Sequence, residues 1–330
     1  MIRIAIIGLG QIGASIGLAL SEKKELIYRT GYDRESSIAH LAEKKGALDK
    51  VARSLENAVE DADLILLALP TNQIKETLGQ LGPYLKESAV VMDTAPVKEK
   101  VAGWAKEALP PDRYYVGLTP VISPAYLETH DYGIDAAYAD LFRGGMMVIV
   151  APPSTPSDAI KLAADLARLL GASSMFADPI EIDGLMAATH ILPQLLAAAL
   201  LNATVDQPGW RERSKVAGKA YAEVTGPVVQ LGDAESLCSA ALLSGENLVR
   251  LTDSVIAILQ NFRHDIENQD GSALTERLER ARAGREAWWK ERHSDIPAES
   301  EMAPKVEAPQ ASDYFARLLG LGGRKIKPKK

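Results

Sequence analysis

The sequence predicts an α/β protein in which an N-terminal Rossmann-type domain, with a doubly wound parallel sheet, precedes a C-terminal all-helical domain. Over the first half of the chain, short β-branched apolar runs alternate with helix-like stretches. This is the pattern of strands that are buried on both faces of a parallel sheet. Beyond residue 182 such runs vanish, and stretches rich in alanine and leucine take over. The length of 330 residues fits about two domains.

The order of these runs predicts the individual elements. Strands are expected at residues 2–7, 27–33, 64–69, 89–92, 114–118, 146–150 and 173–177. Helices are expected between them at 12–24, 36–45, 71–81, 98–108 and 158–170, and afterwards at 183–205, 214–221, 234–245, 247–267 and 272–293. We therefore place a dinucleotide-binding domain at residues 1–178 and a helical substrate and dimerisation domain at 179–293.

The helical region has apolar stripes along its helices, which must be buried against another protein surface. One stripe along the expected helix 247–267 recurs at helical spacing, and either a homodimer interface or an intramolecular core explains it. From residue 294 the composition shifts to proline, glutamate, alanine and serine, which predicts a disordered linker. The basic end, 324–330, is then either a solvated tail or an electrostatic attachment to an acidic partner or membrane surface.

Composition excludes several classes of function. The 37 basic and 44 acidic side chains give a net charge of −7, which disfavours a nucleic-acid partner. The lone Cys238 excludes an intramolecular disulfide, and no cluster with metal-ligand spacing is recognised, so we expect a cytoplasmic protein without a metal site. No apolar run reaches the roughly 18–20 residues of a membrane span, because the closest, 191–201, contains Pro193 and Gln194.

A dinucleotide-binding fingerprint follows the first expected strand. The segment Gly8-Leu9-Gly10-Gln11-Ile12-Gly13 opens the first expected helix, and Asp33 stands about 20 residues later at the end of the second strand. Gly8 permits the tight turn, Gly10 lets the backbone approach a diphosphate, and Gly13 lets the helix pack closely on the strand. The helix N-terminus then faces the anion. We predict a bound dinucleotide.

The acidic residue favours NAD over NADP. Asp33 would accept hydrogen bonds from the adenosine ribose and repel a 2′-phosphate. The neighbouring Arg34 leaves NADP open, because its guanidinium either lies against the adenine or pairs with that phosphate. Further strand ends, at Leu69-Pro70-Thr71 and at Thr94, are expected near the nicotinamide half, since open α/β sheets bind ligands at the carboxyl ends of their strands.

Across roughly residues 1–290 the chain resembles the prephenate/arogenate dehydrogenase family. Besides the glycine segment, Asp93–Lys98 falls where that family has Asp-x-Gly-Ser-x-Lys, and Gly117-Leu118-Thr119-Pro120 falls where it has Gly-x-His-Pro. Residues 183–194 fall where a helix that starts with His-Asp ends in Ser-His-Leu-Pro-His. The resemblance implies NAD-dependent hydride transfer from a small cyclohexadienyl hydroxy acid, with decarboxylation, in tyrosine biosynthesis. It also implies a homodimer formed through the helical domain, with the active site between the two domains.

The departures from the family concentrate on the catalytic positions. Pro96 replaces the serine that orients the base, and Thr119 replaces the histidine that accepts the hydroxyl proton. Ile182, Ile191 and Gln194 stand at further positions that are histidine in the family, and Gly226 stands where an arginine binds a substrate carboxylate. A threonine hydroxyl is no base at neutral pH, so the usual proton relay is missing.

Three residues remain as catalytic candidates: Lys98, Thr119 and His190. Lys98 either supplies a charge to a carboxylate substrate or is a solvated lysine at a helix start. His190 is one position before the family's histidine, which on a regular helix turns its side chain by about 100°. It is either a structural histidine or a substitute base. Two alternatives therefore stay open: a dehydrogenase for a different, less anionic substrate, and a catalytically impaired NAD-binding dimer.

Overall fold

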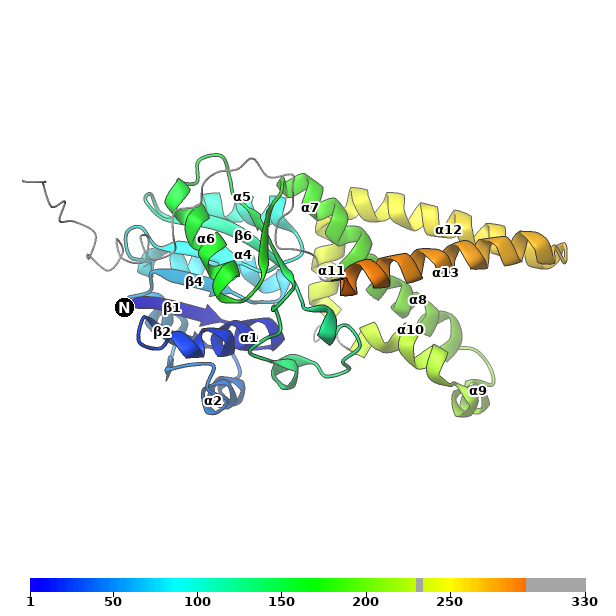
Figure 1. Cartoon of the computed structure of the whole chain (residues 1–330), viewed down its shortest axis with the longest axis horizontal. Helices are drawn as coiled ribbons and strands as arrows, with labels where there is room; N and C mark the ends of the chain where they lie inside the picture. The colour runs from blue at the N-terminus through cyan, green and yellow to red at the C-terminus, as the bar shows by residue number, and fades with distance from the viewer. Residues whose placement is uncertain (230–233, 295–330) are drawn as a thin grey trace, which may run out of the picture.

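The structure is a computed structural model that describes residues 1–229 and 234–294, with a sheet-containing half and a helical half (Figure 1). Among these residues one eight-stranded sheet has the order β3-β2-β1-β4-β5-β6-β7-β8. The strands are β1 Ile2–Ile7, β2 Ile27–Tyr32, β3 Lys50–Val51, β4 Leu64–Leu67, β5 Val90–Asp93, β6 Tyr114–Val121, β7 Met146–Val150 and β8 Ser173–Phe176. The order of the first six is that of a doubly wound dinucleotide-binding sheet. The predicted fold class is confirmed.

Helices cover both faces of the sheet. One face packs against α1 Gln11–Ala19, α2 Ser36–Lys44 and α6 Ser157–Leu169. The other face packs against α3 Leu55–Val59, α4 Thr71–Leu81 and α5 Lys98–Ala108. Successive strand residues point to opposite faces, so in β1 Ile4 and Ile6 join the first cluster whereas Ala5 and Ile7 join the second. This double burial explains why the strand sequences are apolar at nearly every position.

The last two strands run against the others. The pairs from β3 through β6 are parallel, but β6 pairs antiparallel with β7, and β7 pairs parallel with β8. The sequence predicted a parallel sheet throughout. The connection at 122–145 explains the difference, because it contains only the 3-10 turns Pro124–Tyr126 and Gly133–Ala136 and no crossover helix. The chain therefore re-enters the sheet from the edge at which β6 ends.

Predicted and observed boundaries agree closely in this half. The predicted strands differ from the observed ones by at most three residues at an end, and α4 and α5 have their predicted bounds. The first helix ends earlier than predicted, because a 3-10 turn at Leu20–Lys23 replaces its last part. Strand β3 and helix α3 are not predicted at all. They have two and five residues, too few for a periodic pattern.

The helical half begins at α7 Pro179–Met186. A π-helical turn at Ala187–Ile191 joins α7 to α8 Leu192–Val205, and the chain continues through α9 Trp210–Val216, α10 Lys219–Val229, α11 Ala234–Leu243, α12 Gly245–Glu267 and α13 Gly271–His293. The helix predicted at 214–221 is wrong, because the chain leaves α9 in an extended conformation at Ala217 and starts α10 two residues later. The predicted linker and tail, 294–330, lie outside the described residues except for Ser294.

The segment Pro179–Val205 is more continuous than the sequence suggests. Pro193 falls in the first turn of α8, where a missing N–H is tolerated, so it does not interrupt the helix. By length and composition alone the resulting 27-residue helix is apolar enough to cross a membrane, with a hydropathy of 1.6 and 17% of its most apolar window buried. The prediction that no such segment exists was wrong. Core helices of soluble proteins pass the same test when they are mostly buried, which this window is not within the single chain.

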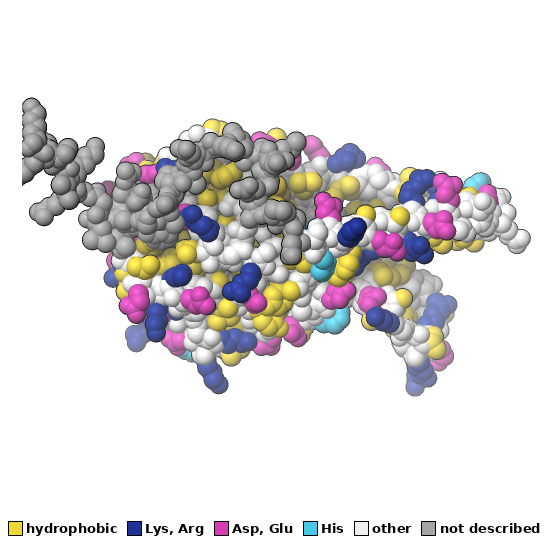
Figure 2. Space-filling view, viewed as in Figure 1, with side chains coloured by type: hydrophobic (Ala, Val, Ile, Leu, Met, Phe, Trp, Pro, Cys, Tyr) yellow, Lys and Arg dark blue, Asp and Glu magenta, His cyan; other side chains and the backbone are white. Residues whose placement is uncertain are grey.

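On the face shown in Figure 2, basic and acidic side chains are interspersed over both halves of the molecule.

Candidate active site

The glycine segment forms a tight turn between β1 and α1. Gly8 has φ +88°, a left-handed conformation that side chains rarely adopt, and a Cβ there would collide with the carbonyl of Ala68. A Cβ on Gly13 would likewise collide with the carbonyl of Gly8, so helix and strand are in close contact. A Cβ on Gly10, in contrast, would meet no atom within 4 Å. The turn is thus closed toward the protein and open at Gly10.

The N-terminus of α1 is available to an anion. Its N-cap residue, Gly10, makes no side-chain cap, and the first turn contains no acidic residue. The positions of Gln11 and Ile12 in that turn leave their backbone N–H groups without an intrahelical partner. Such N–H groups, aligned with the helix dipole, bind phosphate oxygens.

Asp33 holds the glycine turn from the end of β2. Its Oδ2 accepts a hydrogen bond from Leu9 N at 2.8 Å, and its Oδ1 accepts one from Glu35 N at 2.9 Å. The side chain is only half buried, and a carboxylate has about four acceptor sites, so acceptor capacity remains for a ribose. The adjacent Arg34 is exposed.

The end of β4 lies against the same turn, and the end of β5 lies beside β4. Leu69 and Pro70 follow β4, and a Cβ on Gly8 would touch Leu69. Thr94, after β5, donates its N–H to Leu67 O at 3.1 Å. The predicted cofactor-binding residues therefore meet at one edge of the sheet. Thr71 differs, because it is buried and its N–H donates to Ser236 Oγ of α11 at 3.1 Å.

Lys98 lies in a buried ionic cluster. Its Nζ is 2.9 Å from Asp93 Oδ1, and Asp93 Oδ2 accepts a hydrogen bond of 2.6 Å from the Tyr115 hydroxyl. Burial lowers the pKa of Lys98, and Asp93 opposes that change. Burial, and next the Asp93 charge, raise the pKa of Tyr115. The ammonium thus already has a counter-ion inside the fold.

Gly117 makes room for this cluster. A Cβ at this position would lie 2.8 Å from Lys98 Cδ and 3.0 Å from the Tyr115 hydroxyl. The glycine of the segment Gly117-Leu118-Thr119-Pro120 is therefore needed for packing over β6.

Thr119 carries a buried hydroxyl that has no partner among the described residues. Its side chain belongs to a residue that is 2% exposed, and its Oγ1 makes no hydrogen bond within residues 1–229 and 234–294. On the antiparallel β6–β7 ladder Thr119 stands opposite Val148, whose side chain packs with Ile182 of α7. Directly opposite residues share a face of the sheet, so the Thr119 hydroxyl points toward the helical half. Leaving such a group unsatisfied costs about 1–3 kcal/mol.

The helical half reaches into this edge through Asp183 of α7. Its carboxylate accepts hydrogen bonds from Lys98 N and, at 3.1 Å, from Glu99 N, and so caps the start of α5. Burial raises the pKa of Asp183, although the two N–H groups and the Lys98 charge act in the opposite direction. Together with the Ser236 contact to α4, this cap fastens the two halves to each other.

His190 lies in the π-helical turn. Ile191 beside it is fully buried, whereas His190 keeps exposed surface. The ring makes no hydrogen bond or ion pair with any described residue, and loss of surrounding water lowers its pKa. The expected rotation of about 100° assumed a regular α-helix, so it does not apply to a turn widened to i→i+5 bonds.

Two residues that contact the sheet-containing half near this edge are not predicted from the sequence. Ser236 and Arg292 both come from the helical half, and Arg292 Nη2 donates to Ile122 O, just beyond β6, at 2.9 Å. Their partners lie 165 and 170 residues away in the chain, and no local pattern signals such contacts. The buried role of Tyr115 could have been suspected from its place in an apolar run.

Comparison with known proteins agrees with this arrangement. Residues 16–176 match the family described as prephenate dehydrogenase, nucleotide-binding domain. A cyclohexadienyl dehydrogenase of Zymomonas mobilis is 26% identical over 288 residues, which cover 86% of this chain and 94% of the relative. A prephenate dehydrogenase of Bacillus subtilis is 27% identical over 61% of this chain and 53% of its own length.

Solved structures establish the fold. The prephenate dehydrogenase of A. aeolicus, in complex with hydroxyphenyl propionate and NAD+, has a TM-score of 0.75 at 21% identity, covering 87% of this chain and 98% of its own. An arogenate dehydrogenase of Synechocystis has a TM-score of 0.66 at 24% identity, covering 87% and 100%. The nucleotide-binding domain thus belongs to the prephenate dehydrogenase family, and the chain as a whole shares the two-part fold of these enzymes.

Proposed function

We propose that this protein is an NAD-dependent dehydrogenase that oxidises a cyclohexadienyl hydroxy acid of the prephenate or arogenate type with loss of carbon dioxide, in tyrosine biosynthesis. The observation that carries the proposal is the glycine turn, open at Gly10 and held by Asp33, in a domain of this family. The activities named for the Zymomonas and Bacillus relatives support the substrate class.

The residues present fit a dinucleotide. The free N–H groups of α1 would hold the diphosphate, and Asp33 would accept hydrogen bonds from the adenosine ribose. Leu69, Pro70 and Thr94 would border the nicotinamide half, while Thr71, being buried against Ser236, would act through the packing of α4. Hydride acceptance is the chemistry that NAD supplies when bound. We propose NAD over NADP because a carboxylate at Asp33 repels a 2′-phosphate.

Oxidation of a hydroxyl group also releases a proton, and His190 is the proposed acceptor. Its lowered pKa keeps the imidazole neutral at pH 7, and neither ring nitrogen is engaged by a described residue. A neutral imidazole with a free nitrogen is suited to general-base work. Thr119 is proposed to hold a polar group of the bound molecules through its otherwise unpartnered hydroxyl.

Lys98 is proposed to act indirectly. Because its ammonium is fully buried on Asp93, it positions the end of β5 and the start of α5, and does not reach a substrate carboxylate. The charge that such a substrate needs must then come from another residue.

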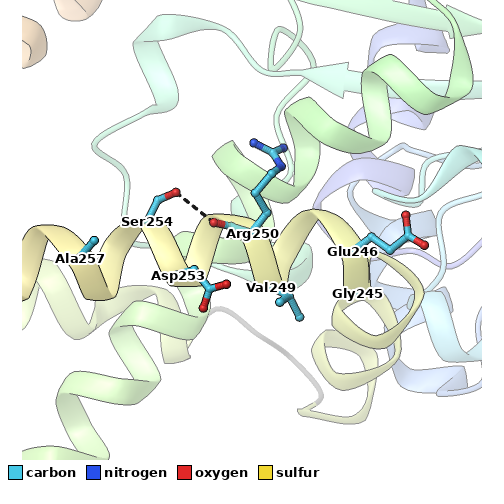
Figure 3. A pocket seen from close by; sticks show the side chains of 7 residues that line it. All are labelled: Gly245, Glu246, Val249, Arg250, Asp253, Ser254 and Ala257. Carbon is cyan, nitrogen blue, oxygen red and sulfur yellow. Dashed lines mark hydrogen bonds between the residues drawn. The ribbon is translucent and has the colours of Figure 1, made fainter.

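We further propose that two copies of the chain form a homodimer through their helical halves. Large apolar side chains stay exposed on several helices of this half, among them Leu196, Val205, Leu242, Val249, Ile256 and Leu259. A shallow surface along α12 adds groups of both charges, because Glu246, Arg250 and Asp253 line it together with Val249 (Figure 3). A self-complementary contact suits such a surface. Sedimentation should give about twice the monomer mass of 35.5 kDa.

A second candidate function follows from Thr119 and Gly226. Without the histidine and arginine that the resemblance implies, the same fold would suit a different, less anionic hydroxy or imino substrate. Incubation with NAD and a panel of prephenate, arogenate and simple 2-hydroxy acids, followed by absorbance of the reduced nicotinamide, separates the two. Turnover of prephenate or arogenate supports the first function, and turnover of another compound supports the second. NAD binding without turnover of any of these compounds would indicate a catalytically impaired NAD-binding dimer.

A further inference from the structure

The last described helix, α13, returns to the sheet-containing half. Figure 1 shows its C-terminal end at the junction of the two halves, next to the connection that follows β6. There Arg292 Nη2 donates a hydrogen bond of 2.9 Å to the carbonyl of Ile122. The arginine side chain is half-buried, and this bond fixes one of its nitrogens on the sheet.

The place where Arg292 arrives is close to the orphaned hydroxyl. Ile122 follows Thr119 by three residues, which in extended chain is about 10 Å. Both lie at the end of β6 that faces the helical half. A guanidinium and an unpartnered buried hydroxyl thus border the same edge of the sheet, the edge at which a parallel α/β sheet binds its ligands.

The guanidinium has unused binding capacity. It donates to a backbone carbonyl, and no described carboxylate pairs with it, whereas Lys98 is neutralised by Asp93. An arginine has five N–H donors in a planar fork that matches a carboxylate in a bidentate manner. Arg292 is therefore a positioned cation with spare donors.

The aromatic ring nearest to this cation along α13 is already covered. Trp289, three residues before Arg292, is half-buried. Its ring centroid lies 4.2 Å from the Arg285 guanidinium and 4.1 Å from the centroid of the tilted His293 ring, so neighbours on the same helix pack against it. Arg292 is therefore the group at the end of α13 that has binding capacity for a carboxylate.

We infer that Arg292 binds the carboxylate of the substrate, so that the end of α13 determines the specificity for anionic compounds. The inference rests on the proposed function, because it takes the substrate to be a carboxylate that binds at this edge. Arg292 would supply the positive charge for the substrate carboxylate, which neither Gly226 nor the buried Lys98 supplies.

The test uses a ligand that needs no turnover. Binding of 3-(4-hydroxyphenyl)propionate to the full chain saturated with NAD is measured by calorimetry for the wild type, Arg292→Gln, Arg292→Lys and Arg280→Gln. Arg280 is the matched control, because it pairs with Glu276 on the same helix, about 18 Å from Arg292. We expect Arg292→Gln to weaken binding at least 10-fold, Arg292→Lys to restore part of it, and Arg280→Gln to stay within 2-fold of wild type. Unchanged NAD affinity and melting temperature show that the variants are folded.

Two results would overturn the inference: equal binding of the aryl propionate by wild type and Arg292→Gln, and no binding by the wild type itself. The proposed function is judged separately by reduction of NAD with prephenate or arogenate. Weaker binding in Arg292→Gln with no turnover of either compound would leave the inference standing and reject the proposed function. If turnover occurs, Arg292→Gln should raise KM at least 10-fold while kcat changes less than 3-fold.

Discussion

The ammonium nitrogen of Lys98 lies 2.9 Å from Oδ1 of Asp93, and neither side chain retains solvent exposure. The same carboxylate also accepts hydrogen bonds from the Tyr115 hydroxyl and from Ala95 N, at 2.6 and 2.8 Å. This pair ties the start of α5 to the end of β5. A residue that would be taken for a solvated lysine is thus part of the core beneath the candidate active site.

Removal of this lysine should destabilise the protein strongly. Lys98→Met leaves the Asp93 carboxylate buried without its counter-ion, and breaking such a pair costs about 3–5 kcal/mol. Urea unfolding should show this loss in the free energy of unfolding. Lys100→Met, at an exposed position on the same helix, should stay within about 0.5 kcal/mol of wild type. Equal effects of the two substitutions would refute a structural role for the pair.

Removal of the orphaned hydroxyl should raise stability and lower activity. Thr119→Val keeps the shape of the side chain and eliminates an unsatisfied buried group, so the free energy of unfolding should rise by about 1–3 kcal/mol. If the hydroxyl holds a bound molecule, kcat/KM should fall about 10-fold, equivalent to roughly 1.4 kcal/mol. A variant that is stabilised but fully active would show that Thr119 takes no part in binding.

Asp183 should contribute a pH dependence to stability. Burial raises its folded-state pKa above the ordinary value of 3.8, so the folded protein binds this proton more tightly than the unfolded chain does. The resulting stabilisation is complete below pH 3.8 and is lost as the pH rises through the raised folded-state pKa. Asp183→Asn keeps an acceptor for the cap and removes the titration. The difference in free energy of unfolding between variant and wild type should therefore change over this window and be constant above it.

His190 should control the acidic limb of the pH–rate profile. A lowered pKa means that the imidazole is protonated only below the ordinary value of 6.5, so kcat/KM should fall as the pH drops through that lowered pKa. His190→Asn should remove the limb and reduce kcat/KM by about 10²–10⁴-fold. A variant that keeps the wild-type profile would exclude His190 as the base.

Local pattern predicted the sheet-containing half well, for a physical reason. Strands such as β1 and β7 are buried on both faces, so their sequences are apolar throughout and their bounds are visible. The reversed direction of β7 was not visible, because it depends on the missing crossover helix at 122–145. Likewise, Pro193 suggests a helix interruption in the sequence, but it lies in the first turn of α8, directly after a π-helical turn, and does not break the helix.

The candidate site was predicted in part. The glycine segment and Asp33 were found because a dinucleotide imposes fixed spacing on one strand-turn-helix unit. The burial of Lys98, the Asp183 cap and the Arg292 contact depend on how the two halves pack, over separations of 85 and 170 residues for the last two. No local sequence pattern encodes such distances.

Calorimetric titration of the purified chain with NAD and with NADP shows whether the glycine turn and Asp33 form an NAD site, with Asp33→Asn and Gly10→Val as companion variants. NAD should bind, NADP should bind more weakly, and Gly10→Val should weaken NAD binding by filling the open side of the turn. Asp33→Asn should narrow the preference between the two coenzymes by removing the charge that repels the 2′-phosphate. No heat with either coenzyme, or tighter binding of NADP than of NAD by the wild type, would contradict this assignment of the NAD site.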